Sequence, residues 1–192
     1  MSRVEFVGSY PGALPALGLP EIAFAGRSNV GKSSALNTLV RHKSIARVSR
    51  TPGRTQAINL FRVDDRVAFA DLPGYGFAEV PDAVREAWKP MIEGYLGERE
   101  ELKLVVVLID VRREVGELDG ALLYGLAEAR IPALVVATKC DKLGKQQLAR
   151  QIAALRRGYH LPEGQPIAFS SQTGAGRDAV WAAIDAAIGE VG

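Results

Sequence analysis

The chain has 192 residues and a formal net charge of +2, with 24% charged and 47% hydrophobic residues. These values suit one globular domain with its own core, and no low-complexity segment is present. The longest apolar run, 104–109, is far shorter than the roughly 20 residues that cross a bilayer. Residues 1–10 lack the apolar run of a secretory signal. The single cysteine, Cys140, excludes an intrachain disulfide, so we expect a cytoplasmic protein without membrane contact.

The charge is unevenly distributed along the chain. Between Ile22 and Val63 there are eight Lys or Arg residues and no Asp or Glu, a local charge of +8, which leaves −6 for the remainder. Such asymmetry is typical of a surface that binds anions. A nucleic-acid partner and a solvated surface around a phosphate site both fit this feature, and it does not choose between them.

The N-terminal part of the chain shows short extended runs separated by loops. Prolines and glycines over 8–20 favour an irregular lead-in, and a polar, basic segment interrupted by Pro52-Gly53 reads as a loop. A helix should begin near Gly31 and bury Leu36, Leu39 and Val40. Two extended runs around Asp64-Asp65 predict a hairpin. The lead-in covers 1–20, the first strand 22–25 and the loop 42–56. The two hairpin strands cover 57–63 and 67–70.

The C-terminal part alternates aliphatic runs with helical periods. Continuous aliphatic runs are typical of central parallel strands that are covered on both faces. These runs cover 104–109, 133–137 and, more briefly, 167–169. Leu, Ile and Val recur at helical spacing over 118–126, 148–155 and 180–188. The chain is therefore expected to form one domain over 1–192, an α/β sandwich with a mostly parallel six-stranded sheet that includes one antiparallel strand.

The segment Gly26–Ser33 reads GRSNVGKS and fits the pattern G-x-x-x-x-G-K-[ST]. It lies between a predicted strand and a predicted helix, where backbone N–H groups and the helix N-terminus can surround a phosphate. Lys32 should reach the β- and γ-phosphates, and the Ser33 hydroxyl should bind Mg²⁺. The motif predicts a P-loop NTPase, a three-layer α/β/α fold, but does not separate ATP from GTP.

Asp71-Leu72-Pro73-Gly74 follows the run 67–70 directly. In P-loop NTPases an acidic residue at the end of such a strand holds Mg²⁺, often through water. The Gly74 N–H can bind a γ-phosphate, and this contact exists with GTP but not with GDP. The segment therefore predicts a switch between ordered and disordered states.

Thr138-Lys139-Cys140-Asp141 follows the run 133–137 and predicts guanine recognition. A carboxylate at Asp141 can accept hydrogen bonds from the N1–H and 2-amino groups of guanine, whereas adenine has neither donor. The Lys139 stem can lie against the base. Backbone N–H groups of Phe169-Ser170-Ser171, at another strand end, could bind the guanine O6.

A threonine between the P-loop and Asp71 is needed to complete the Mg²⁺ shell. Thr55 is our choice because it immediately precedes a strand, and Thr51 is the rival. All these segments except this loop fall at the carboxyl ends of predicted strands, where open α/β sheets bind ligands.

Six motifs together resemble the EngB family of bacterial GTPases, which belongs to the TrmE-Era-EngA-EngB-septin group. They are GRSNVGKSS at 26–34, PGRTQ at 52–56, DLPGYGFA at 71–78, REAW at 85–88, TKCDK at 138–142 and SSQTGAG at 170–176. The resemblance covers the chain from about Pro20 onward. It implies hydrolysis of GTP to GDP with Mg²⁺, and a role in assembly of the large ribosomal subunit with ribosomal RNA and proteins as partners. It also implies a bacterial cytoplasm and a link to normal cell division and septation. We expect the protein to be a monomer.

The resemblance also implies site residues by position. Ser33, Thr55 and Asp71 would bind Mg²⁺, and Lys32, Thr55 and Gly74 would take part in catalysis. The nucleotide would be lined by Gly26, Arg27, Ser28, Asn29, Val30, Gly31, Lys32, Ser33, Ser34, Gly53, Arg54, Thr55, Asp71, Leu72, Pro73, Gly74, Thr138, Lys139, Cys140, Asp141, Phe169, Ser170 and Ser171.

Three positions qualify these expectations. Thr138 stands where many GTPases have Asn, and it offers a smaller tether. Tyr75 follows Gly74 where many GTPases carry a water-orienting Gln, so we expect slow intrinsic turnover that a partner or a cation raises. Asn29 either helps to hold a K⁺ that supplies charge to the transition state, as in relatives of this group, or only shapes the loop.

Two other functions remain open from the sequence. A P-loop kinase or ATPase would tolerate adenine, and Asp141 argues against it. A nucleotide-stabilised scaffold that binds RNA with little turnover fits the missing water-orienting Gln. Comparing GTP with ATP binding separates the first alternative, and measuring phosphate release with and without large ribosomal subunits separates the second.

Overall fold

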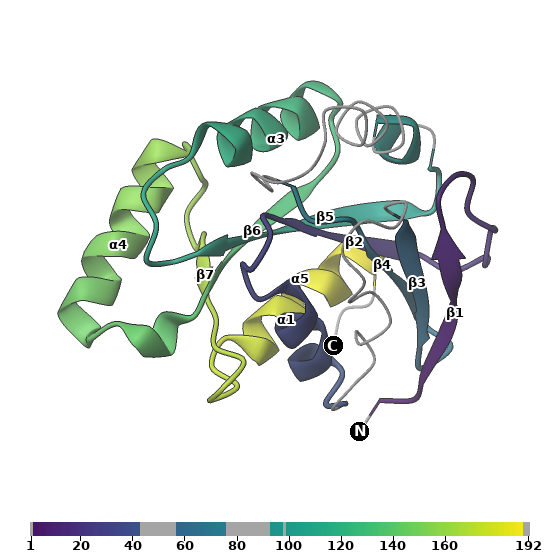
Figure 1. The fold of residues 1–192 in the computed structure, drawn as a ribbon, viewed down its shortest axis with the longest axis horizontal. Coiled ribbons are helices and arrows are strands. Elements are labelled where there is room, and N and C mark those ends of the chain that lie inside the picture. The colour runs from purple at the N-terminus through teal and green to yellow at the C-terminus, as the bar shows by residue number, and fades with distance from the viewer. Residues whose placement is uncertain (1, 43–56, 76–92, 98, 190–192) are drawn as a thin grey trace.

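The computed structural model describes residues 2–42, 57–75, 93–97 and 99–189. One seven-stranded sheet organises them, in the order β1-β3-β4-β2-β5-β6-β7 (Figure 1). The strands are β1 Val4–Tyr10, β2 Glu21–Gly26, β3 Ile58–Val63, β4 Val67–Asp71, β5 Leu102–Asp110, β6 Ala133–Thr138 and β7 Ile167–Ala168. Strands β4, β2, β5, β6 and β7 are parallel to one another, and β3 is antiparallel to both of its neighbours. The mostly parallel sheet with one antiparallel strand is therefore confirmed.

The expected number of six strands was wrong, because part of the predicted irregular lead-in is a strand. Strand β1 pairs antiparallel with β3, and its register shifts between Phe6 and Gly8. The Phe6 ring packs on Phe61 with a centroid distance of 5.4 Å. Each residue of β1 is at least partly exposed, so backbone pairing to a neighbouring strand, and not a buried apolar pattern, defines it. Hydrophobic periodicity carries little information about such an edge strand.

Helices cover both faces of the sheet (Figure 1). They are α1 Lys32–Leu39, α3 Glu117–Glu128, α4 Lys145–Gly158 and α5 Arg177–Ile188, with a short 3₁₀ helix η2 at Cys140–Lys142. Helices α1 and α5 lie on one face, and α3 and α4 lie on the other. The predicted start of α1 is confirmed, since Gly31 is its N-cap and Leu36, Leu39 and Val40 are buried.

Each face has its own apolar core. On the α1/α5 face Phe24 and Phe69 pack together at 4.8 Å between ring centroids, and the Trp181 indole N–H donates to the Leu39 carbonyl at 2.8 Å. On the other face Leu126 of α3 and Leu155 of α4 are fully buried against the sheet. Because both faces are covered, the carboxyl edge of the parallel strands is the part of the sheet left for a site.

Among residues 2–42, 57–75, 93–97 and 99–189, no helix combines the length and apolar character that a membrane span requires.

Candidate nucleotide-binding site

The phosphate-loop segment connects the end of β2 to the start of α1. Its backbone turns tightly, with left-handed φ angles of 62° at Asn29 and 100° at Gly31. A Cβ at Gly26 would lie 2.9 Å from Val30 Cγ1 and 3.0 Å from the Leu108 carbonyl oxygen, so only glycine fits there. Helix α1 has no side-chain cap and no acidic residue in its first turn. Its positive end is therefore not neutralised by the chain and suits an anion.

Lys32 and Asp71 form an ion pair between α1 and the end of β4. Their side chains are only 12% and 7% exposed, and buried charges are tolerated when they are paired. These are the two residues that the sequence assigns to the phosphates and to Mg²⁺. The fold therefore brings the predicted cation and the predicted carboxylate to one point beside the phosphate loop.

The segment after Asp71 runs along the phosphate loop. The Tyr75 N–H donates to the Gly26 carbonyl at 3.3 Å, and the Ser28 N–H donates to the Tyr75 carbonyl at 2.9 Å. A Cβ on Gly74 would lie 3.2 Å from Ser28 Oγ and 3.5 Å from Ser28 Cα. A side chain at 74 would press on Ser28, so this close approach favours glycine. It places the predicted γ-phosphate sensor directly against the predicted phosphate loop.

The Tyr75 side chain enters a buried polar cluster that sequence analysis missed. Its hydroxyl donates to Asp119 Oδ1 at 2.7 Å, and the Tyr159 hydroxyl donates to Asp119 Oδ2 at 3.3 Å. The Gly116 N–H donates to the Tyr159 hydroxyl oxygen at 2.7 Å. Burial, followed by the negative charge of Asp119, raises the pKa of Tyr75 far above its ordinary value, so this hydroxyl remains a donor. We call Tyr75, Asp119, Tyr159 and Gly116 the tyrosine–aspartate cluster.

No sequence signal pointed to this cluster. Asp119 lies in the first turn of α3, where an acidic residue complements the helix dipole without any further role. Tyr159 is the C-cap residue of α4 and looks like an ordinary apolar anchor. Only the tertiary fold brings these residues to Tyr75.

The predicted base-recognition loops also lie together. The Ser170 hydroxyl donates to Asp141 Oδ1 at 2.6 Å, and the Cys140 N–H donates to the Phe169 carbonyl at 3.1 Å. The hydrogen bond from Ser170 lowers the pKa of Asp141. Asp141 is therefore an ionised acceptor at neutral pH, which is the state that guanine recognition requires.

The base loop, residues 138–141, is hydrogen-bonded to the phosphate loop, residues 26–33. The Thr138 hydroxyl donates to the Val30 carbonyl at 2.7 Å, and Lys139 Nζ donates to the Asn29 carbonyl at 2.8 Å. Lys139 also pairs with Asp110 Oδ2 at 2.9 Å. These bonds fix the distance between the two segments that the sequence assigns to the base and to the phosphates.

Asp110 is a second residue that sequence analysis missed. It ends β5 and is 3% exposed. Burial opposes its ionisation, but hydrogen bonds from Arg112 and Lys139 hold the pKa of Asp110 well below its ordinary value. Its position after the run 104–109 is the same strand-end signal that identified Asp71, so this residue could have been found.

Part of the predicted site lies outside the described residues. This part comprises Gly53, Arg54, Thr55 and the rival Thr51.

Among the described residues, no group of three or more His, Cys, Asp or Glu side chains could hold a metal ion. Ser33 and Asp71 nevertheless fit Mg²⁺, because Mg²⁺ is commonly held by one or two carboxylates together with substrate phosphates and water.

Comparisons with known proteins agree with this geometry. The model of a family described as "50S ribosome-binding GTPase" matches residues 21–139. A probable GTP-binding protein EngB of Geobacter metallireducens is 49% identical over 187 residues, which cover 96% of this chain and 92% of that protein. Its counterpart in Syntrophus aciditrophicus is 49% identical over 189 residues, which cover 97% and 96% of the two chains.

A solved structure agrees as well. The crystal structure of a probable GTP-binding protein engB superposes with a TM-score of 0.73 at 26% sequence identity. The match covers 89% of this chain and 100% of that chain.

The tyrosine–aspartate cluster predicts a stability loss for Tyr159→Phe. This change removes the acceptor of the Gly116 N–H and one donor to Asp119, and unsatisfied buried polar groups cost about 1–3 kcal/mol. Urea unfolding monitored by circular dichroism measures the free energy of unfolding. Tyr124→Phe is the matched control, because Tyr124 is 69% exposed and should change stability little. Equal losses in the two variants would contradict a structural role for the cluster.

Proposed function

Because the chain belongs to the EngB family of GTP-binding proteins, we propose that it is a GTPase switch that acts in assembly of the large ribosomal subunit. The family establishes a P-loop GTPase that binds guanine nucleotide. The observation that best supports the assignment of individual residues is the pair of hydrogen bonds that join the base loop to the phosphate loop, from Thr138 to Val30 and from Lys139 to Asn29. These bonds hold the two loops at a fixed distance, so that one rigid site can bind both the base and the phosphates of a nucleotide.

We assign the phosphate end of the site to α1 and β4. Lys32 neutralises the β- and γ-phosphates, and the Gly74 N–H senses the γ-phosphate. Ser33, Asp71 and Thr55 hold Mg²⁺, which supplies positive charge to the phosphate oxygens. The support for this assignment is the Lys32–Asp71 pair, whose two charges lie beside the phosphate loop.

We assign the base end to Asp141 and the segment Phe169–Ser171. The Asp141 carboxylate accepts from the N1–H and 2-amino groups of guanine, and backbone N–H groups of the segment reach O6. The hydrogen bond from Ser170 to Asp141 orients the carboxylate before the base arrives. This preorganisation is the property that a specificity residue needs.

We propose slow intrinsic turnover, raised by a partner or a cation. Tyr75 holds the position where many GTPases carry a water-orienting Gln. Its hydroxyl is committed to Asp119, so it is not available to a water at the γ-phosphate. The same observation favours a second candidate function, a guanine-nucleotide-stabilised scaffold on RNA with little turnover.

Asp141→Asn should lose guanine selectivity. The amide keeps one acceptor but adds a donor facing the guanine N–H groups, and losing hydrogen bonds to a charged group costs about 3 kcal/mol, or roughly 100-fold in GTP affinity. Xanthosine triphosphate should bind more tightly to the variant than to the parent, because its 2-oxo group accepts from the new donor. Fluorescence titration of both nucleotides measures these affinities.

The control for this variant is Asp178→Asn in α5, whose side chain is 93% exposed and should leave affinity unchanged. Unchanged GTP affinity in Asp141→Asn, or ATP binding as tight as GTP binding in the parent, would refute the assignment.

We propose that K⁺ near Asn29 contributes to turnover. Asn29 is exposed, and its side-chain amide makes no hydrogen bond within the described part of the chain. GTP hydrolysis should therefore be about tenfold or more faster in potassium than in sodium buffer. Asn29→Gly should remove this difference, since glycine tolerates the left-handed φ of 62° but lacks the amide oxygen. Equal parent rates in the two buffers would show that Asn29 only shapes the loop.

We propose ribosomal RNA and proteins of the large subunit as partners, in a cytoplasmic monomer on which normal cell division and septation depend. The matching family description, "50S ribosome-binding GTPase", supports this partner. The region from Ile22 to Val63, with a charge of +8, agrees with it.

Co-sedimentation with purified ribosomal subunits tests the proposed partner. The protein should pellet with large and not with small subunits, to an extent that differs several-fold between GDP and a non-hydrolysable GTP analogue. Phosphate release should rise about tenfold or more when large subunits are added. Binding to large subunits without any rise in phosphate release would favour the scaffold. No binding in any nucleotide state would reject the ribosomal partner.

A further inference from the structure

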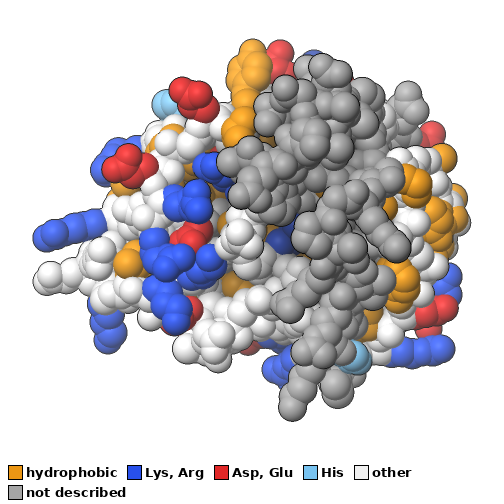
Figure 2. Space-filling view, in the orientation of Figure 1, with side chains coloured by type: hydrophobic (Ala, Val, Ile, Leu, Met, Phe, Trp, Pro, Cys, Tyr) orange, Lys and Arg blue, Asp and Glu red, His pale blue; other side chains and the backbone are white. Residues whose placement is uncertain are grey.

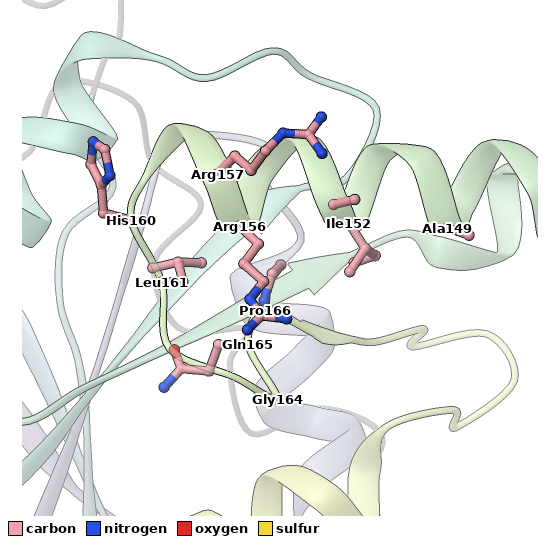
Figure 3. A pocket seen from close by; sticks show the side chains of 10 residues that line it. Ala149, Ile152, Arg156, Arg157, His160, Leu161, Gly164, Gln165 and Pro166 are labelled. Carbon is pink, nitrogen blue, oxygen red and sulfur yellow. The ribbon is translucent and has the colours of Figure 1, made fainter.

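An open groove of about 800 Å³ lies between the C-terminal half of α4 and the segment that follows it. Arg156 and Arg157, in the last turn of the helix, both line the groove. Figure 3 shows the Arg156 side chain directed toward Pro166, whereas the Arg157 guanidinium lies on the side of the helix away from residues 164–166. Of the described residues that line the groove, none is acidic. One wall is fixed to the sheet, because the Gln165 side-chain carbonyl accepts a 2.8 Å hydrogen bond from the Val135 N–H of β6.

Helix α4 carries basic residues and no acidic ones. Its cations are Lys145, Arg150, Arg156 and Arg157. With 3.6 residues per turn, these four fall within a sector about 140° wide. Ala149 and Ala153 lie in the same sector and line the groove, together with the larger apolar side chains of Ile152 and Leu161. In Figure 2 the side of the molecule that carries α4 shows more Lys and Arg than Asp and Glu side chains.

Helix stability does not explain this charge pattern. Arg156 and Arg157 in the last turn do complement the helix dipole, but Lys145 lies in the first turn, where a cation is unfavourable. Arg150 has only Gln and Ala three and four residues away, so it gains no ion pair along the helix. Within the described ranges no carboxylate pairs with any of the four cations. Their mutual repulsion is therefore relieved only by an external anion or by solvent.

We propose that this basic face of α4 and its groove bind the phosphate backbone of RNA, an inference that rests on the proposed ribosomal partner. Lys145 and Arg157 are about 18 Å apart along the helix axis at 1.5 Å per residue, which is long enough for several backbone phosphates. Phosphate contacts from Lys and Arg supply sequence-independent affinity for nucleic acid. A membrane surface is a poorer fit, because Ile152 and Leu161, the large apolar side chains of the groove, are partly buried against the core and do not project outward to insert into a bilayer.

The test compares RNA binding by the full chain and by the double variant Arg156→Ala, Arg157→Ala. Fluorescence anisotropy with a labelled RNA hairpin measures Kd over a range of salt concentrations. Removing two phosphate contacts should weaken binding about tenfold or more at physiological salt, and should make the slope of log Kd against log salt shallower by about two. The conservative double variant Arg156→Lys, Arg157→Lys should keep most of the affinity, because backbone phosphates are bound through charge.

Arg3→Ala with Lys103→Ala is the matched control, since it also removes two exposed cations. Arg3 is the residue before β1, and Lys103 lies in β5. It should stay within twofold of the parent. A double α4 variant within twofold of the parent would overturn the proposal. Displacement of the hairpin by polyglutamate at equal charge concentration would also overturn it, in favour of an acidic protein. Unchanged guanine-nucleotide affinity confirms that the α4 variant is folded.

Co-sedimentation separates this inference from the proposed function. If the parent and the double α4 variant pellet equally with large subunits, the ribosomal partner stands and the α4 surface is wrong. If the parent does not pellet with them, the ribosomal partner is wrong, while the hairpin titration still decides whether α4 binds RNA. Weaker pelleting of the α4 variant alone supports both.

Discussion

The ion pair between Lys32 and Asp71 joins the phosphate loop to the parallel sheet. Strand β4 pairs with β2 so that Asp71 lies beside Phe24, two residues before the loop begins at Gly26. The pair is largely buried, and removing one partner of a buried pair costs roughly 3–5 kcal/mol because the other charge is left alone. In the proposed site, a nucleotide phosphate and Mg²⁺ would give Lys32 and Asp71 each a new partner of opposite charge. Binding would then exchange partners and leave neither buried charge alone.

The base loop depends on the phosphate loop in the same way. Thr138 occupies the position where many GTPases have Asn, yet its hydroxyl still reaches the Val30 carbonyl at 2.7 Å. Lys139 bridges the Asn29 carbonyl and the buried Asp110 carboxylate. Asp110 ends β5 and Thr138 ends β6, and β5 lies between β6 and β2, the strand that leads into the phosphate loop. The distance between the proposed base and phosphate sites therefore follows from strand order. A shorter tether is sufficient because the strands already bring the loops together.

Strand ends explain what the sequence could and could not predict. Parallel strands place their carboxyl ends at one edge, so motifs at Gly26, Asp71 and Thr138 predicted neighbouring positions without any tertiary information. Strand β1 was not predicted, because an exposed edge strand has little hydrophobic pattern. The hydrogen bond between Tyr75 and Asp119 was not predicted, because local sequence spacing carries no information about residues 44 positions apart. Local spacing thus predicts which segments meet at this edge of the sheet, and only the fold shows which side chains hold them in place.

The tyrosine–aspartate cluster opposes movement of Tyr75, the residue that follows Gly74. Order–disorder transitions of this segment are the general response of GTPases to the γ-phosphate. Any displacement that separates Tyr75 from Asp119 leaves a carboxylate that is 4% exposed with one fewer donor, which costs about 1.5–3 kcal/mol. Asp119 then depends more on Tyr159, the residue that caps α4. The free energy of moving Tyr75, which follows the proposed γ-phosphate sensor Gly74, therefore depends partly on Tyr159 at the end of α4, the helix that carries the basic groove.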